Sequence, residues 1–157
     1  MGEMASAMGF FERLLSSPDK TALADLAELA GRKEALIAHL THHAELCSLG
    51  TIKAGLQHVA AQQSEGFKVL RAILADRDTW PRPPEAAPHD GSNNWERLSH
   101  DLAILHAIAG GVQKAVSTWQ GLDSALAEKL TPIAIADGEA ESELRALALK
   151  CDPQALD

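Results

Sequence analysis

Four stretches of this chain place an apolar residue at every third or fourth position, which is the spacing of one buried face of an α-helix. They cover Met4–Leu15 and about residues 19–49, 51–78 and 93–119. Shorter helical segments follow at Leu122–Leu130 and Glu139–Lys150, with Pro132 and the Asp137-Gly138 pair expected to break the helix between them. The pattern predicts an all-α protein, an antiparallel bundle of four main helices with short flanking helices.

The composition supports closely packed helices rather than a sheet. Hydrophobic residues make up 46% of the 157 positions, yet there are three Phe, three Trp and no Tyr. Ala and Leu supply most of the apolar content, whereas strands favour β-branched and aromatic residues. A chain of this length is expected to form one domain, residues 1–157, with a core large enough to be stable without disulfides or a structural metal ion.

Turn signals divide the helices. Pro18, after Ser16-Ser17, is predicted to open the second helix, and Gly50 to mark a tight antiparallel hairpin. Residues 79–93 hold four prolines and are predicted to form a Pro-rich loop between the third and fourth helices. Asn93 followed by Glu96 is typical of a capping box at the next helix start. Gly110-Gly111 marks a kink or a close backbone approach.

The charge excludes some partners. A formal net charge of −8 and the lack of a basic face argue against nucleic acid and against an anionic membrane surface as partners. No signal peptide and no run of about 20 apolar residues is visible, so a cytoplasmic location is expected. An acidic surface suits a protein partner.

Histidines are the residues most suggestive of chemistry. Six of the seven lie in predicted helices, and three crowd into residues 39–43. His39 and His43 are four residues apart on one helix side, which can present two imidazoles to one metal ion, and His106 borders the apolar face of the fourth helix. If the fourth helix runs back along the third, His106 lies roughly 7–13 Å along the bundle from the other two.

No Glu-x-x-His motif of a ferritin-like di-metal site occurs in the chain. We therefore predict no cofactor, and we keep a metal ion at His39, His43 and His106 as the alternative. The other histidines are expected to face solvent, with His100 paired to Glu96 at i,i+4.

Other polar residues interrupt the apolar stripes. Lys33 lies centrally on the apolar face of the second helix, and Asp101 lies on that of the fourth. Their estimated positions along the bundle axis predict a partly buried Lys33–Asp101 pair. Such a pair either specifies the register of the helices or belongs to a catalytic or binding site. Cys47 and Cys151 are more than 100 residues apart and form no disulfide framework, so Cys47 is expected to be a core thiol. Trp80, beside Pro81, is the candidate anchor residue of an interface.

Ala22–Ile37 resembles the first long helix of FlgN-type flagellar export chaperones, and Gln57–Leu74 resembles their returning helix. The resemblance covers about residues 19–75, whereas the part after Trp80 does not match, and an asparagine expected in the returning helix is missing. It implies a non-catalytic, acidic, cytoplasmic escort for secreted subunits.

The chain has no Gly-x-Ser-x-Gly, phosphate-binding loop or dinucleotide-binding motif, which favours a non-enzymatic protein. The leading functional prediction is a helical interaction module, an adaptor or chaperone-like protein that binds another protein. One alternative is a metal- or oxygen-handling bundle of ferritin-like or hemerythrin-like type. A second alternative is a homodimeric scaffold protein with Trp80 in its interface.

Overall fold

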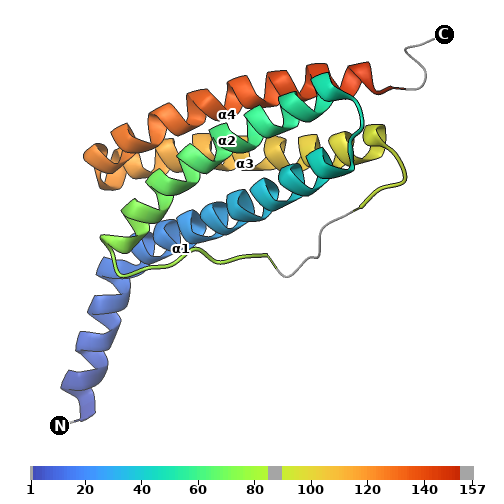
Figure 1. Ribbon diagram of the computed structural model, residues 1–157. Helices are drawn as coiled ribbons and strands as arrows, with labels where there is room; N and C mark the ends of the chain where they lie inside the picture. The colour runs from blue at the N-terminus through green and yellow to red at the C-terminus, as the bar shows by residue number, and fades with distance from the viewer. Residues whose placement is uncertain (1, 85–89, 153–157) are drawn as a thin grey trace.

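The chain folds into an all-α four-helix bundle in the computed structural model (Figure 1). The structure describes residues 2–84 and 90–152, and the side chains of residues 18–84 and 90–152. The helices are α1 (Gly2–Leu46), α2 (Gly50–Ala75), α3 (Asn94–Leu122) and α4 (Ser124–Lys150). In the part that the structure describes, no helix is both long enough and apolar enough to cross a bilayer.

The predicted number of main helices, four, is correct, but two of the predicted helix breaks do not occur. The predicted first and second helices are one helix, because α1 continues through Pro18. The predicted pieces after Gly121 are also one helix, because α4 continues through Pro132 and Gly138. A proline removes one helical hydrogen bond, a local cost that the packing of the flanking turns can outweigh. Around Pro132 the buried residues on both sides, Leu130 and Ile133 among them, show that tertiary packing overrides the breaker signal.

The four helices form a square in which α1 packs on α2 and α3, and α4 packs on the same two helices. Figure 1 shows α1 and α4 running one way and α2 and α3 the other way. Diagonal helices are therefore parallel, while every neighbouring pair is antiparallel. The helix levels estimated from the sequence depended on the condition that α3 runs back along α2, and the structure does not meet this condition.

The long connection explains that topology. The 18 residues between Ala75 and Asn94 could span about 60 Å when extended, whereas the 26 residues of α2 rise about 39 Å. The connection is therefore long enough to return along the whole bundle, and Figure 1 shows its described first part, residues 76–84, following α1. The backbone N–H of Arg82 donates to the Ala27 carbonyl of α1 at 2.8 Å. We call this segment, residues 76–93, the crossover.

Gly31 makes this contact possible. A Cβ atom at Gly31 would lie 1.8 Å from the carbonyl oxygen of Arg82, so only glycine lets the crossover lie on α1. Gly111 of α3 serves similarly at the α1/α3 contact, where an added Cβ would lie 2.5 Å from Leu29 Cδ2. The close approach predicted for Gly110-Gly111 is thus confirmed at Gly111, while Gly110 faces open space.

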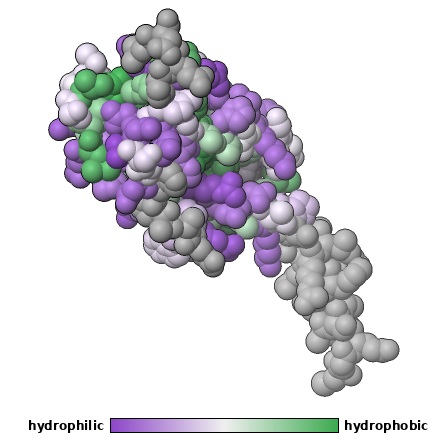
Figure 2. Space-filling model, turned by 90° about the vertical axis from the view of Figure 1, so that its right-hand side faces the viewer, coloured by the Kyte–Doolittle hydropathy of each residue, from purple (hydrophilic) through white to green (hydrophobic). Residues whose placement is uncertain are grey.

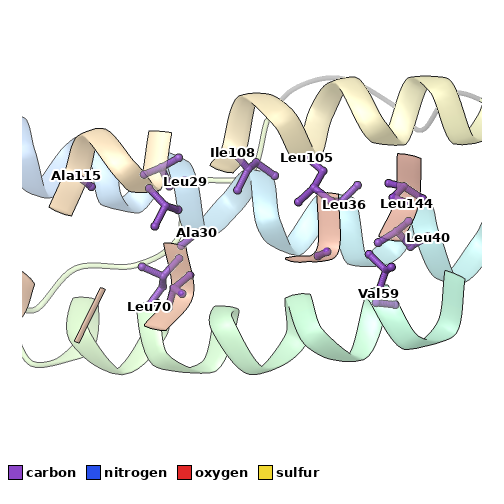
Figure 3. Close-up of a cluster of buried hydrophobic side chains, with 14 of the residues drawn as sticks. Leu29, Ala30, Leu36, Leu40, Val59, Leu70, Leu105, Ile108, Ala115 and Leu144 are labelled. Carbon is purple, nitrogen blue, oxygen red and sulfur yellow. The ribbon is translucent and has the colours of Figure 1, made fainter. Parts of the chain in front are cut away.

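The core is mostly aliphatic. Leu36 of α1 and Leu105 of α3 point toward each other in Figure 3, and both are fully buried. Caps fix the ends of α3 and α4. Asn93 Oδ1 accepts the Glu96 N–H at 2.9 Å, as the predicted capping box requires, while Glu96 reaches back to the N–H of Ser92. Asp123 caps α4 by accepting the Leu126 N–H at 3.2 Å.

Candidate functional site

A buried group of histidines around one carboxylate lies between α1 and α3. His43 has no exposed surface, and its Nδ1 lies 2.5 Å from Asp101 Oδ2. His39, one helical turn earlier, is 6% exposed, and its Nδ1 lies 3.8 Å from the other oxygen of Asp101. This distance is that of a hydrogen bond, in which Nδ1 of His43 is the donor when Asp101 is ionised, because an ionised carboxylate only accepts. We call His39, His43, His100 and Asp101 the histidine cluster.

The histidine cluster arises from the antiparallel packing of α1 against α3. His39 and His43 share one face of α1 because they are four residues apart, and Asp101 is on the facing turn of α3. His100 is half-buried rather than solvent-facing as predicted, and its ring stacks on His39 with centroids 6.1 Å apart. The rings of His39 and His43 are 6.0 Å apart. The histidine cluster is therefore a compact polar group beside an aliphatic core.

His106 does not join the histidine cluster. Its side chain is 73% exposed, and its Nδ1 lies 2.7 Å from Glu141 Oε1 of α4. Two of the three predicted metal ligands, His39 and His43, thus share a site, and the third lies elsewhere. Within residues 18–84 and 90–152, no three His, Cys, Asp or Glu side chains are arranged to hold a metal ion. Metal binding stays a prediction for elemental analysis of the purified protein.

The remaining two helical histidines lie on the surface. His58 is exposed, as predicted, and its Nδ1 contacts Glu143 of α4 at 2.9 Å. His42, predicted to face solvent, is partly exposed and contacts Asp90 at 2.9 Å. Such exposed pairs contribute at most about 1 kcal/mol to the free energy of unfolding, so we interpret them as surface ion pairs and not as part of a functional site.

A second buried polar group lies in the middle of the bundle. Lys33 Nζ of α1 donates to Gln63 Oε1 of α2 at 2.6 Å and to Asp137 Oδ1 of α4 at 2.5 Å. Gln63 Nε2 also donates to that Asp137 oxygen at 3.0 Å. All three residues are at most 1% exposed. We call them the central triad, and it joins three of the four helices.

The central triad corrects the predicted Lys33–Asp101 pair. Both residues are buried as expected, but Lys33 bonds Asp137 and Asp101 bonds His43. The error followed from the wrong direction assigned to α3. Burial lowers the pKa of Lys33 below 10.5, although the charge of Asp137 and its hydrogen bond partly oppose this shift.

Sequence reasoning missed Asp137 because Asp137-Gly138 is typical of a turn. A usable signal was present, since Leu130, Ile133, Asp137, Ala140 and Leu144 keep the spacing of one buried helix face. An aspartate on such a face needs a buried partner.

Trp80 lies on the crossover and is 71% exposed. Cys47 is buried, as predicted for a core thiol, and Cys151 is half-buried. The chain matches no model of a known protein family and no curated protein.

Proposed function

We propose that this protein is a non-enzymatic interaction module that binds an amphipathic helix of a partner protein. The observation that carries the proposal is an apolar groove between α3 and α4. Eight residues line the groove: Trp95, Ser99, Leu102, Ala103, His106, Arg145, Ala148 and Leu149. We call it the α3/α4 groove.

The α3/α4 groove lies toward the end of the bundle where α1 and α4 finish and α2 and α3 begin. Figure 2 views the molecule from that end, and hydrophobic surface gathers on one side of it. Three exposed leucines belong to this end: Leu46 is 45% exposed, Leu49 55% and Leu149 57%. Only Leu149 of the three lines the α3/α4 groove, and exposed apolar surface on an acidic protein is typical of a binding surface.

The shape of the α3/α4 groove favours a helix as the ligand. Two antiparallel helices leave a straight groove between them, and an amphipathic helix can bury its apolar face in that groove. His106 and Arg145 both contact Glu141 at the rim, at 2.7 and 3.0 Å. An apolar floor with such a polar rim is the usual composition of a protein interface.

Two substitutions on α4, one inside the α3/α4 groove and one outside it, test the proposal. Leu149 lies in the α3/α4 groove, whereas Ile135 lies outside it and is equally exposed, at 60%. Leu149→Glu should lower capture of the partner at least tenfold, measured by affinity capture with quantitative mass spectrometry. Ile135→Glu should leave capture unchanged, and circular dichroism should show both variants folded.

Equal capture by the native protein and both variants would remove the α3/α4 groove from the interface. Trp80→Ala in the same experiment asks whether the crossover contributes a second contact, as the sequence predicted. A protein that captures only itself, and whose sedimentation depends on concentration, would instead support the homodimeric scaffold.

A further inference from the structure

A cleft of about 230 Å³ lies between α1 and α3, toward the opposite end of α3 from the α3/α4 groove. A cavity of about 150 Å³ holds one benzene molecule, so this cleft has room for a single ring and a few further atoms. Small residues leave this space open, since Ala22, Gly111 and Ala115 line the cleft where larger side chains would fill it. We call it the α1/α3 cleft.

The register of α1 against α3 places opposite charges on the two walls of the cleft. Leu29 faces Gly111, because its Cδ2 lies 2.5 Å from the position that a Cβ on Gly111 would take. The helices are antiparallel, so Asp25, one turn before Leu29, is level with Ala115, one turn after Gly111. Asp25 of α1 and Lys114 of α3 both line the cleft and therefore lie at nearly the same height.

The charges of Asp25 and Lys114 are available to a ligand. Both side chains are exposed, and neither has a hydrogen bond or ion pair within residues 18–84 and 90–152. Glu28 and Arg32, the other two charged residues of the cleft, pair with each other at 3.9 Å. The lining is therefore neutral as a whole. A ligand with a single charge would face one like charge here, whereas a zwitterion complements both walls.

Trp119 lies at the end of the cleft that is level with Ala22. It is 1% exposed, and its buried Nε1 has no acceptor within the side chains that the structure describes. The Arg77 guanidinium covers the ring at 4.9 Å and itself donates to Asp123, so the indole is held in place. Buried donors are nearly always hydrogen-bonded, so an unsatisfied donor in the wall of a cleft points to an acceptor supplied by a ligand.

We propose that the α1/α3 cleft binds a small zwitterion of the amino-acid class with an apolar side chain. Its ammonium group faces Asp25, and its carboxylate lies between Lys114 and the indole N–H of Trp119. Its apolar group packs on Leu29 and Ala115, which form the floor (Figure 3). The inference is independent of the proposed function, because the cleft and the α3/α4 groove share no lining residue.

L-Phenylalanine is the probe, titrated to about 10 mM because ligands of this size bind weakly. The readout is the nitrogen–proton NMR spectrum, in which each of the three Trp residues gives one indole N–H signal. Trp80→Phe and Trp95→Phe identify two of these signals, which leaves that of Trp119. We expect phenylalanine to shift the Trp119 signal saturably and to leave the signals of Trp80 and Trp95 in place.

Two analogues and two substitutions separate the contributions of the charges. 3-Phenylpropionate lacks the ammonium group and 2-phenylethylamine lacks the carboxylate, so each should bind at least about threefold more weakly than phenylalanine. Asp25→Asn should weaken phenylalanine by a similar factor without weakening 3-phenylpropionate. Lys114→Gln should do the same without weakening 2-phenylethylamine. Lys53→Gln, on the exposed side of α2, is the matched control and should change none of the three affinities.

Two results would overturn the proposal. A Trp119 signal that stays in place at the highest phenylalanine concentration would show that the cleft does not bind this class of ligand. Equal affinities for the three compounds, or affinities that neither Asp25→Asn nor Lys114→Gln changes, would show that the charges of the two walls play no part in recognition.

Discussion

Lys33 and Asp137 place opposite charges inside an aliphatic core, and each side chain depends on the other there. Removing only Lys33 leaves the buried Asp137 carboxylate and the Gln63 amide oxygen without the group that donates hydrogen bonds to both, and breaking a buried pair in this way typically costs about 3–5 kcal/mol. We therefore expect Lys33→Met to lower the free energy of unfolding by about that amount. Urea unfolding followed by circular dichroism measures the change.

The double variant Lys33→Met/Asp137→Leu is the matched control for this pair. It removes both charges and keeps similar volumes, so it should be clearly more stable than Lys33→Met alone. If the two single substitutions simply added, the two groups would not be coupled, and the central triad would not act as a unit.

At the scale of the elements, two glycines inside helices make opposite predictions. Gly31→Ala should destabilise the protein by more than about 1 kcal/mol, because its Cβ would meet the crossover backbone at Arg82 and no flexible side chain can yield. Gly110→Ala meets nothing within 4 Å and should stabilise α3 by up to about 1 kcal/mol. Thermal unfolding of the two variants measures both effects.

Helix propensity alone favours both substitutions. The difference between their effects on stability therefore measures the contribution of the crossover contact. If Gly31→Ala stabilised the protein as much as Gly110→Ala, the contact between Arg82 and α1 would contribute nothing. The Arg82 N–H and Ala27 carbonyl pair would then have no role in directing the crossover along α1.

Across the whole molecule, the titration of Lys33 connects stability to pH. Its pKa is lowered in the folded protein, so the unfolded chain binds the proton more tightly between the folded value and 10.5. The stability contributed by Lys33 is therefore complete above 10.5 and is lost as the pH falls through the folded value. The native protein should gain stability relative to Lys33→Met as the pH rises toward 10.5.

Urea unfolding of both proteins over the alkaline range tests this linkage. The other lysines titrate in both proteins, so their contribution cancels in the difference. A difference in unfolding free energy that stayed constant with pH would show that Lys33 has the same pKa in the folded and unfolded states.

The sequence by itself determined the helical class, the α1/α2 hairpin and much of the buried surface. Apolar spacing of three and four residues depends only on the 3.6-residue period of a helix, so it can be recognised without any tertiary contact. The capping box at Asn93 and the close approach at Gly111 are likewise local signals, and both were predicted correctly.

Only the tertiary structure decided which polar residues meet. The direction of α3 depends on where the crossover lies, and that depends on Gly31 contacting Arg82 from 51 positions away. Once α3 is antiparallel to α1, Asp101 bonds His43, Asp137 is left for Lys33, and His106 faces Glu141. Contacts between distant residues depend on helix order and direction, which periodicity along a single helix does not encode.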